Sequence, residues 1–374
     1  MAISERHGDR FSPVFDISRV SVSFVAGNLA LGGAERQLFY LARGLRHGGA
    51  NVRVLSLTQG DFWEQKLRDI GVSVTWVGQH TSRVQRLKRI VSGLRLDRPA
   101  IVQSHHFYTN LYVVAAARLL GLREVGAVRN DAYCEVAFTG RLGPLSLRTP
   151  RVLAANSRAG AENAVALGVP SHRVRLLPNV VDTEHFAPAP GRCREGVRLV
   201  TIGMRAEKRV DRFLALISRL RSQSGLPITA TVVGDGPDRL RWQRRAAELG
   251  LPPEIVAFER AVPVTGVVYR AADILVMTSD FEGTPNVALE AMASGLPVVA
   301  YRTGGVPEVV QHGETGFIAE MGDEDAMSDY VLRLVRSSEL RACMGRRSRQ
   351  YVQAHYGLNR LPDILSAFYQ KVLE

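Results

Sequence analysis

Cysteine is scarce in this sequence, and its spacing shows no sign of pairing. The three cysteines, Cys134, Cys193 and Cys343, are odd in number and widely separated. This pattern excludes a disulfide framework and the paired spacing of a zinc site. Long apolar runs are also missing, so no spanning helix of about 18 or more residues is expected. Residues 1–16 are polar and mixed in charge, unlike a secretory signal. A cytoplasmic protein with reduced thiols is therefore expected.

Lysine is equally scarce, and the positive charge comes from arginine. Only four of the 48 basic residues are lysines, and the formal net charge is +12. Residues 1–190 hold 24 basic against 14 acidic residues, whereas the remainder holds 24 against 22. A basic surface attracts nucleic acid, anionic lipid or acidic small molecules. Because the sequence lacks interleaved aromatic residues and recognised nucleic-acid-binding modules, nucleic acid is not an expected partner.

The chain of 374 residues is long enough for two domains. Short apolar runs alternate with helical patterns in both halves, which predicts an α/β protein with parallel sheets. Residues 186–192 have the composition of a linker. The predicted domains are therefore residues 1–188 and 189–355, followed by a last helix over 356–374. The predicted strands are residues 19–26, 52–57, 72–77, 100–105, 125–131, 152–157, 174–182, 197–203, 230–237, 255–258, 274–277 and 297–300.

Residues 280–295 are the most informative stretch. They follow a buried run and predict a helix from Pro285, with Thr284 as its N-cap and Gly295 as its stop. The free N–H groups at such a helix start bind anions such as a diphosphate. Glu290 lies on the second turn and leans toward that end, where a carboxylate repels phosphate but holds the hydroxyls of a ribose. The pattern indicates a nucleotide-sugar site.

Within this stretch, Glu282 and Glu290 match the E-x7-E signature of the family 4 glycosyltransferases, and residues 281–293 match the surrounding motif. The chain resembles this family over about residues 20–370. The resemblance implies the GT-B fold, in which two doubly wound Rossmann-like domains face an interdomain cleft and the last helix crosses back onto the first domain. It also implies retaining, metal-independent transfer from a nucleoside diphosphate sugar to a glycan or lipid-linked acceptor.

The resemblance assigns roles to the residues of the motif. Glu282 would act at the donor sugar as a catalytic residue, and Glu290 would hold the ribose. The remaining residues assigned to donor binding are Gly283, Thr284, Asn286 and Val287.

A glycine loop and a basic pair complete the predicted donor site. Gly32 and Gly33 lie between the first predicted strand and a helical pattern, an arrangement typical of phosphate binding, although a plain turn is an equal alternative on local sequence. The resemblance assigns both glycines to the loop that closes over the donor phosphates. Lys208 matches the family's lysine, but Arg205 lies three residues before it instead of the usual five. These two cations would stabilise the charge of the diphosphate leaving group.

Histidine and arginine end two predicted strands of the first domain. His105 matches the family's strand-end histidine and is predicted to be catalytic, whereas His106 is predicted to face away. Arg129, at the next strand end, is predicted to face the acceptor. Residues 83–96 predict a basic amphipathic helix, which either covers the sheet or contacts anionic lipid at the inner face of a membrane.

Asp323, Glu324 and Asp325 imitate a metal-binding D-x-D motif, but they precede a helical pattern and are interpreted as acids at a helix start. Neither a metal nor a cofactor is predicted.

Two enzyme classes and one binding class remain open. The alternatives to glycosyl transfer are a nucleotide-sugar epimerase of the same fold and a non-catalytic sugar- or lipid-binding relative.

Overall fold

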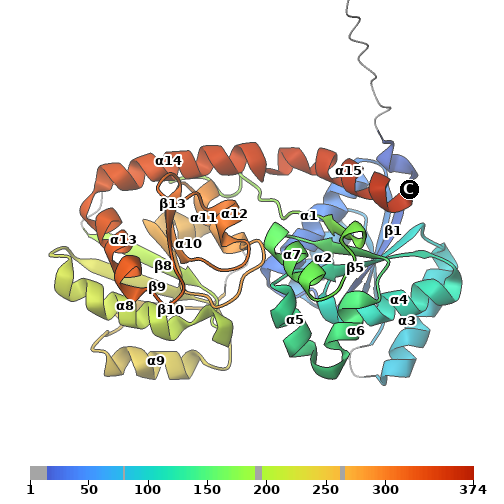
Figure 1. The fold of residues 1–374 in the computed structure, drawn as a ribbon, viewed down its shortest axis with the longest axis horizontal. Coiled ribbons are helices and arrows are strands. Elements are labelled where there is room, and N and C mark those ends of the chain that lie inside the picture. Colours follow the sequence, from blue (N-terminus) through green and yellow to red (C-terminus); the bar gives the residue numbers. More distant parts are fainter. Residues whose placement is uncertain (1–14, 79–80, 190–195, 262–265) are drawn as a thin grey trace, which may run out of the picture.

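A computed structural model describes residues 15–78, 81–189, 196–261 and 266–374; Cys193 lies outside these ranges. Two domains lie side by side, and each has a parallel β-sheet between layers of helices (Figure 1). The predicted pair of doubly wound domains is confirmed. The strands are rich in buried valine, leucine, isoleucine and alanine because helices cover both faces of each sheet.

The first sheet has the strand order β3-β2-β1-β4-β5-β6-β7 within the described residues, and neighbouring strands are parallel. Its strands are β1 Ser21–Ala26, β2 Asn51–Ser56, β3 Ser73–Trp76, β4 Ile101–Ser104, β5 Arg123–Val128, β6 Val152–Ala155 and β7 Val174–Leu176. The helices are α1 Gly33–His47, α2 Phe62–Asp69, α3 Arg83–Asp97, α4 Asn110–Leu120, α5 Ala132–Thr139, α6 Gly143–Arg148 and α7 Arg158–Ala166. Short 3-10 turns are η1 Ile17–Arg19, η2 Phe107–Thr109, η3 Gly140–Leu142 and η4 Ser171–Arg173.

The second sheet has the order β10-β9-β8-β11-β12-β13, again parallel. Its strands are β8 Val197–Ile202, β9 Ile228–Val233, β10 Val256–Glu259, β11 Ile274–Met277, β12 Val298–Tyr301 and β13 Gly316–Ala319. The helices are α8 Val210–Gln223, α9 Arg239–Glu248, α10 Gly266–Ala271, α11 Asn286–Ala293, α12 Val306–Val309 and α13 Glu324–Arg336, with η5 Ala206–Lys208. The sequence prediction missed β13, a four-residue strand that begins with glycine, a residue depleted in strands.

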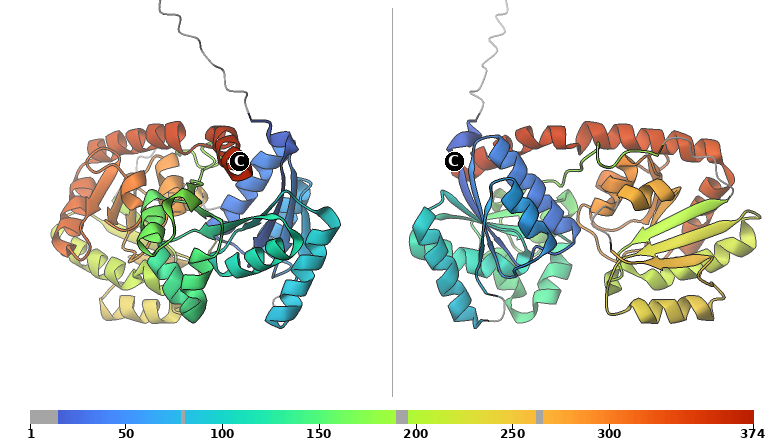
Figure 2. Two further views of the ribbon diagram at one scale, coloured as in Figure 1. Left: turned by 45° about the vertical axis from the view of Figure 1, so that its right-hand side comes forward. Right: turned by 180° about the vertical axis from the view of Figure 1, so that it is seen from behind.

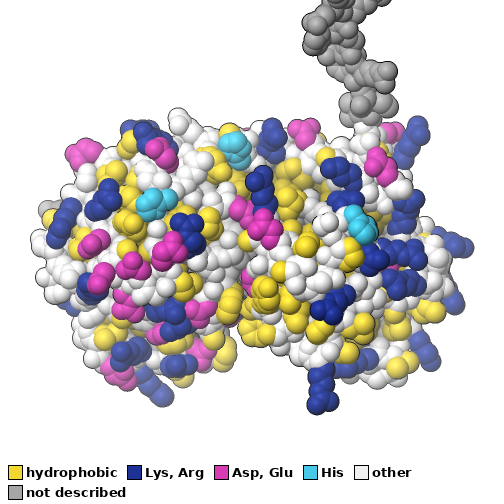
Figure 3. Space-filling model, viewed as in Figure 1, with side chains coloured by type: hydrophobic (Ala, Val, Ile, Leu, Met, Phe, Trp, Pro, Cys, Tyr) yellow, Lys and Arg dark blue, Asp and Glu magenta, His cyan; other side chains and the backbone are white. Residues whose placement is uncertain are grey.

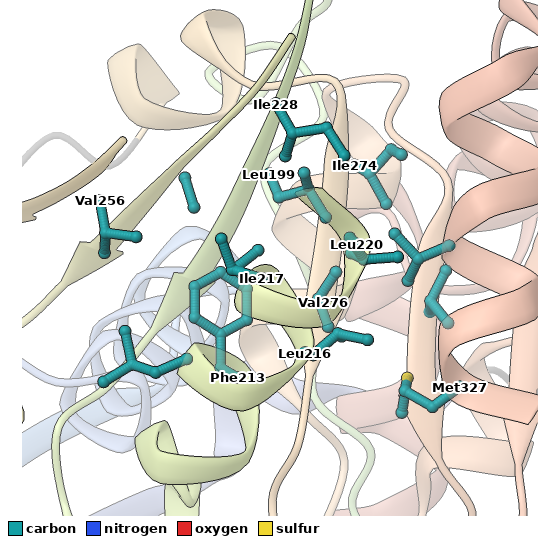
Figure 4. Close-up of a cluster of buried hydrophobic side chains, with 14 of the residues drawn as sticks. Leu199, Phe213, Leu216, Ile217, Leu220, Ile228, Val256, Ile274, Val276 and Met327 are labelled. Carbon is teal, nitrogen blue, oxygen red and sulfur yellow. The ribbon is translucent and has the colours of Figure 1, made fainter. Parts of the chain in front are cut away.

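The core of the second domain forms where α8 packs on its sheet (Figure 4). Phe213, Ile217 and Leu220 recur at helical spacing and are fully buried against Leu199 of β8 and Ile274 of β11. Full burial of such a side chain contributes roughly 1.5–3 kcal/mol. This packing fixes the carboxyl ends of β8 and β11, from which the chain leads into η5 and α11.

The C-terminal helices connect the two domains. Helix α14, Ser338–His355, lies on the second domain, and η6 Leu358–Arg360 and α15 Leu361–Leu373 lie on the first, against α1 (Figures 1 and 2). Leu365 and Phe368 of α15 belong to the first domain's core. The buried hydroxyl of Tyr369 donates to Oε1 of Gln103 on β4, at 2.7 Å.

The excess of positive charge lies on the first domain, where basic side chains outnumber acidic ones on the face shown in Figure 3. Helix α3 forms where a basic amphipathic helix was predicted, and Ser82 caps it by accepting from the N–H of Gln85. Ile90 and Leu94 are buried, whereas Val84 and Leu96 are exposed. Within the described ranges, no helix has the length and apolar character needed to cross a membrane.

Candidate active site

The carboxyl ends of the two sheets face each other, and this is where open parallel sheets bind ligands. Helix α1 follows β1 and α11 follows β11, and both helices begin at this edge. A Cβ placed on Gly33 would lie 2.5 Å from Nδ2 of Asn286, so the first turns of the two helices touch across the cleft. Two helix N-termini, each with the partial positive charge of its helix dipole, therefore converge.

Asn286, the first residue of α11, is held by the first domain. Gln37 and Asn179 donate to its side-chain oxygen at 2.9 and 3.1 Å. Gln37 also donates to the carbonyl of Val180, at 2.7 Å. Gln37 and Asn179 were not predicted from the sequence, although Gln37 lies one turn into the helix after the predicted glycine loop. The side chain of Val287 packs against the second domain's core.

The predicted capping of α11 by Thr284 is wrong. Pro285 is the N-cap, and the hydroxyl of Thr284 instead donates to the carbonyl of Asn156 in the first domain, at 2.6 Å. The hydroxyl is buried at the domain contact, where it needs a partner that the short helix does not supply. The predicted stop is confirmed, because Gly295 follows the C-cap with a left-handed φ of 75°.

Glu282 and Lys208 meet in the approach to α11. The ammonium of Lys208 donates to Oε1 of Glu282 at 2.6 Å, and both side chains are largely buried. Arg205 is exposed. Burial raises the pKa of the Tyr108 phenol in the first domain, and the charge of Arg205 opposes this rise from across the cleft. The structure therefore brings Glu282 and Lys208 into direct contact and leaves Arg205 beside them, facing the first domain.

Glu290 joins the domains through a buried ion pair. One carboxylate oxygen accepts from Arg36 of α1, and the other accepts from the hydroxyl of Tyr269 at 2.9 Å. Burial and the neighbouring carboxylate raise the pKa of Tyr269 well above its ordinary value, so the phenol keeps its proton and donates. The Arg36 guanidinium also lies 5.4 Å from the ring centre of Phe186. Arg36 and Tyr269 were not predicted, because they meet Glu290 only in the folded chain.

His105 and His106 both contact the loop and first turn of α1, so the prediction that His106 faces away is wrong. Nε2 of His105 lies 2.7 Å from the carbonyl of Ala34, which only accepts, so this nitrogen carries the proton. Burial and the charges of Arg129 and His106 hold the pKa of His105 well below its usual range, so the ring is neutral. Nδ1 of His106 accepts from the N–H of Gly27, and its Nε2 faces Glu35 at 3.1 Å.

Arg129 follows β5 directly and sits beside Glu135 of α5. Its backbone N–H lies 3.4 Å from Oε1 of Glu135, and its carbonyl accepts from Asn156 at 2.8 Å. Burial lowers the pKa of Arg129 to about 10. Burial also raises the pKa of Glu135 to about 7, against the lowering effect of the backbone N–H groups of Arg129 and Asn130 and of the Arg129 charge. The guanidinium therefore stays charged at neutral pH, whereas the carboxyl is about half protonated.

Replacing Glu135 with glutamine should make stability less dependent on pH. Between its ordinary pKa of 4.5 and about 7, the folded protein binds more protons at Glu135 than the unfolded chain does. The free energy of unfolding of the wild type therefore falls as pH rises through this window. The free energy of unfolding of Glu135→Gln, taken relative to that of wild type, should therefore rise by roughly 2–3 kcal/mol from pH 5 to pH 8. Urea denaturation at both values measures this, with exposed Glu254→Gln as the control; equal pH dependence in wild type and Glu135→Gln would contradict it.

A further contact closes the cleft at the start of α7. The carboxylate of Glu308, on α12, accepts from the backbone N–H groups of Arg158 and Ala159, at 2.9 Å each. This acid at a helix N-terminus is favourable for both the free N–H groups and the helix dipole. The domains are thus in direct contact around α11.

The acidic run at 323–325 has the structural role predicted for it. The side chain of Asp323 accepts from the N–H of Ala326 and caps α13. Within the four ranges that the structure describes, no group of three or more His, Cys, Asp or Glu side chains is arranged to hold a metal ion.

Both halves of the chain match known families. Residues 31–185 match Glycosyltransferase Family 4, and residues 199–351 match Glycosyl transferases group 1. The GDP-mannose-dependent alpha-(1-6)-phosphatidylinositol monomannoside mannosyltransferase of Mycolicibacterium smegmatis is 35% identical over 221 residues, or 53% of this chain and 57% of that protein. The N-acetyl-alpha-D-glucosaminyl L-malate synthase of Bacillus anthracis is 31% identical over 142 residues, or 38% of this chain. The chain thus spans only 57% and 37% of the length of these relatives.

Solved structures match nearly the whole chain. Anabaena HepE in complex with UDP-glucose has a TM-score of 0.83 at 17% identity, with coverage of 94% of this chain and 99% of that one. Sucrose-phosphate synthase from Thermosynechococcus elongatus has a TM-score of 0.80 at 16% identity, covering 95% and 99%. These likenesses confirm the predicted GT-B fold.

Proposed function

Because the chain belongs to the family 4 glycosyltransferases, we propose that it transfers a glycosyl group from a nucleoside diphosphate sugar to a hydroxyl-bearing acceptor. The observation that carries this proposal is the meeting of two helix N-termini, at Gly33 and Asn286, next to the Lys208–Glu282 pair. The N–H groups at helix starts and a lysine ammonium bind the oxygens of a diphosphate. The adjacent carboxylates accept hydrogen bonds from the hydroxyls of the two sugars that the diphosphate joins.

The diphosphate is the leaving group of the proposed reaction, so its charge grows as the glycosidic bond breaks. Lys208 and the free N–H groups of α1 and α11 would stabilise that charge in a cleft from which closure excludes water. Glu282 holds Lys208 in place through the 2.6 Å contact. Arg205, exposed on the same loop, would supply a second cation once a donor is bound.

The two acids of the motif would hold the sugars of the donor. Glu282 would accept from hydroxyls of the transferred sugar, and Glu290 from the ribose. The carboxylate of Glu290 already accepts hydrogen bonds from Arg36 and Tyr269. The ribose would take the place of Arg36 as the domains open.

We propose retention of anomeric configuration by attack on the face from which the diphosphate leaves, without a metal. The transition state would resemble an oxocarbenium ion. His105 would contact the sugar through Nδ1, the ring nitrogen that does not face Ala34. A nucleotide-sugar epimerase is not favoured, because the named relatives above are glycosyltransferases or synthases.

The acceptor is proposed to be a glycan or a lipid-linked molecule, in a cytoplasmic protein that touches the inner face of a membrane. The M. smegmatis relative is named for a phosphatidylinositol mannoside, which supports a lipid-linked acceptor. On α3, the exposed Val84 and Leu96 lie among basic residues, a surface that suits anionic headgroups.

A donor screen tests the proposed function. UDP-, GDP- and ADP-sugars should be compared by thermal shift, because a nucleotide that binds only the folded state raises the melting temperature. The donor found in this way should be hydrolysed slowly without acceptor, and Glu282→Gln should abolish the hydrolysis. NMR of the released sugar or glycoside should show the donor's anomeric configuration. Stabilisation by none of the nucleotide sugars, or an epimerised nucleotide sugar as the product, would overturn the proposal.

A further inference from the structure

Three adjacent strands of the first sheet, β4, β5 and β6, end in polar residues that have unused hydrogen-bonding atoms. His105 and Arg129 follow β4 and β5 directly, and Asn156 follows β6. Among the residues that the structure describes, no partner reaches Nδ1 of His105, Nε and Nη2 of Arg129, or Oδ1 of Asn156, and all four atoms are buried. Buried polar atoms are normally paired, so such a group of unpaired atoms points to a ligand.

The unpaired atoms include both hydrogen-bond donors and hydrogen-bond acceptors. The two nitrogens of Arg129 are donors. Nδ1 of His105 is an acceptor, because Nε2 holds the ring proton and faces the carbonyl of Ala34. Oδ1 of Asn156 is also an acceptor, since the amide nitrogen of the same side chain donates to the carbonyl of Arg129. A ligand that satisfies all three residues needs an anionic group and at least one hydroxyl.

The charge of Arg129 is not fully balanced within the described chain. Neither Nε nor Nη2 of its guanidinium makes a hydrogen bond to a carboxylate there. Glu135, whose charge does act on Arg129, has a pKa raised by burial to about 7 and carries only part of a charge at neutral pH. A buried guanidinium without a paired anion is unfavourable, and an incoming anion would relieve this.

We propose that the carboxyl ends of β4, β5 and β6 form a subsite for a carboxylate or phosphate group of the substrate, which Arg129 binds while His105 accepts from a neighbouring substrate hydroxyl. The subsite adjoins the donor loop, because a Cβ on Gly283 would lie 2.6 Å from the carbonyl of Arg129. The inference rests on the proposed glycosyl transfer for its assignment to a substrate. The anion has two sources, an acidic acceptor or an acidic donor sugar.

Calorimetric titration of the full-length protein tests both sources with matched pairs of probes. In the acceptor arm, sn-glycerol 3-phosphate is compared with glycerol. In the donor arm, UDP-glucuronate is compared with UDP-glucose. In at least one arm the anionic probe should bind more tightly to wild type, and Arg129→Met should weaken that binding about 10- to 100-fold, as expected for a charge-assisted hydrogen bond. Arg129→Lys should restore part of the affinity, and neutral probes should bind all variants alike.

Two further variants make the result decisive. Arg141→Met, which removes an exposed arginine of the same domain, should leave every affinity unchanged. Loss of glycerol phosphate binding in Lys208→Met but not in Arg129→Met would place the anion at the diphosphate site and overturn the inference. Equal binding of charged and neutral probes to wild type would also overturn it. If anions bind in an Arg129-dependent way but no nucleotide sugar binds, the result would contradict the proposed function and support this subsite.

Discussion

Replacing Lys208 with methionine should lower kcat/KM for glycosyl transfer on the order of 10²–10³-fold, the typical cost of losing one group that stabilises a developing negative charge. The side chain is nearly isosteric, so the loop keeps its volume and loses only the ammonium. The loss should fall mainly on kcat, because the charge on the diphosphate develops as the bond breaks. Single-turnover kinetics with the donor identified by the screen measures it.

Loss of the ammonium also leaves the buried Glu282 carboxylate without the partner that contacts it at 2.6 Å. The double variant Lys208→Met/Glu282→Gln removes that unpaired charge and should recover thermal stability but no activity. Exposed Lys66→Met is the matched control and should behave as wild type. If Lys208→Met keeps more than about a tenth of the wild-type kcat/KM, the role assigned to Lys208 fails.

Replacing Gly283 with alanine should lower kcat about 100-fold, because a displacement of about 1 Å in the catalytic geometry costs this much. A Cβ at this position would lie 2.6 Å from the carbonyl of Arg129 and 2.8 Å from Oδ1 of Asn156. Both atoms belong to the first domain, so the added methyl group obstructs closure of the cleft rather than folding of either domain. Small-angle X-ray scattering should show a larger radius of gyration than that of wild type.

Gly236→Ala is the control for an added methyl group. The nearest atom to its Cβ, on Met204, would be 3.6 Å away, which is ordinary contact within the second domain. This variant should retain activity and closure. A fully active Gly283→Ala, or one whose radius of gyration matches wild type, would show that the close approach at Gly283 is unnecessary for the reaction.

Local pattern was sufficient to place the secondary structure around the motif. The helix after β11, its end at Gly295 and the helix start at the acidic run 323–325 depend on neighbours in sequence, and the structure has all three. Patterning failed where a residue's partner lies in another element of the fold. Thr284 has the chemistry of an N-cap, but its hydroxyl donates to Asn156, 128 residues away.

The partners of Glu290 illustrate the same limit. The sequence around Arg36 does not distinguish it from a solvent-exposed arginine, and the sequence around Tyr269 does not distinguish it from an ordinary core tyrosine. Their contacts with one carboxylate arise because α1 and α10 are brought to the same edge as α11. The Gln37–Asn286 hydrogen bond likewise spans 249 residues.

The sequence by itself determined the two parallel-sheet domains and the helix that follows the loop at 280–285, because helix and strand periodicity, glycine turns and charge are properties of short segments. Only the tertiary structure decided which groups meet in the cleft and which buried atoms stay unpaired. Those outcomes depend on close packing between segments that are distant in sequence, where a single methyl group or one hydrogen bond determines the geometry. The unpaired Nε and Nη2 of Arg129 belong to these outcomes, since pairing is a property of the folded surroundings and not of the residue.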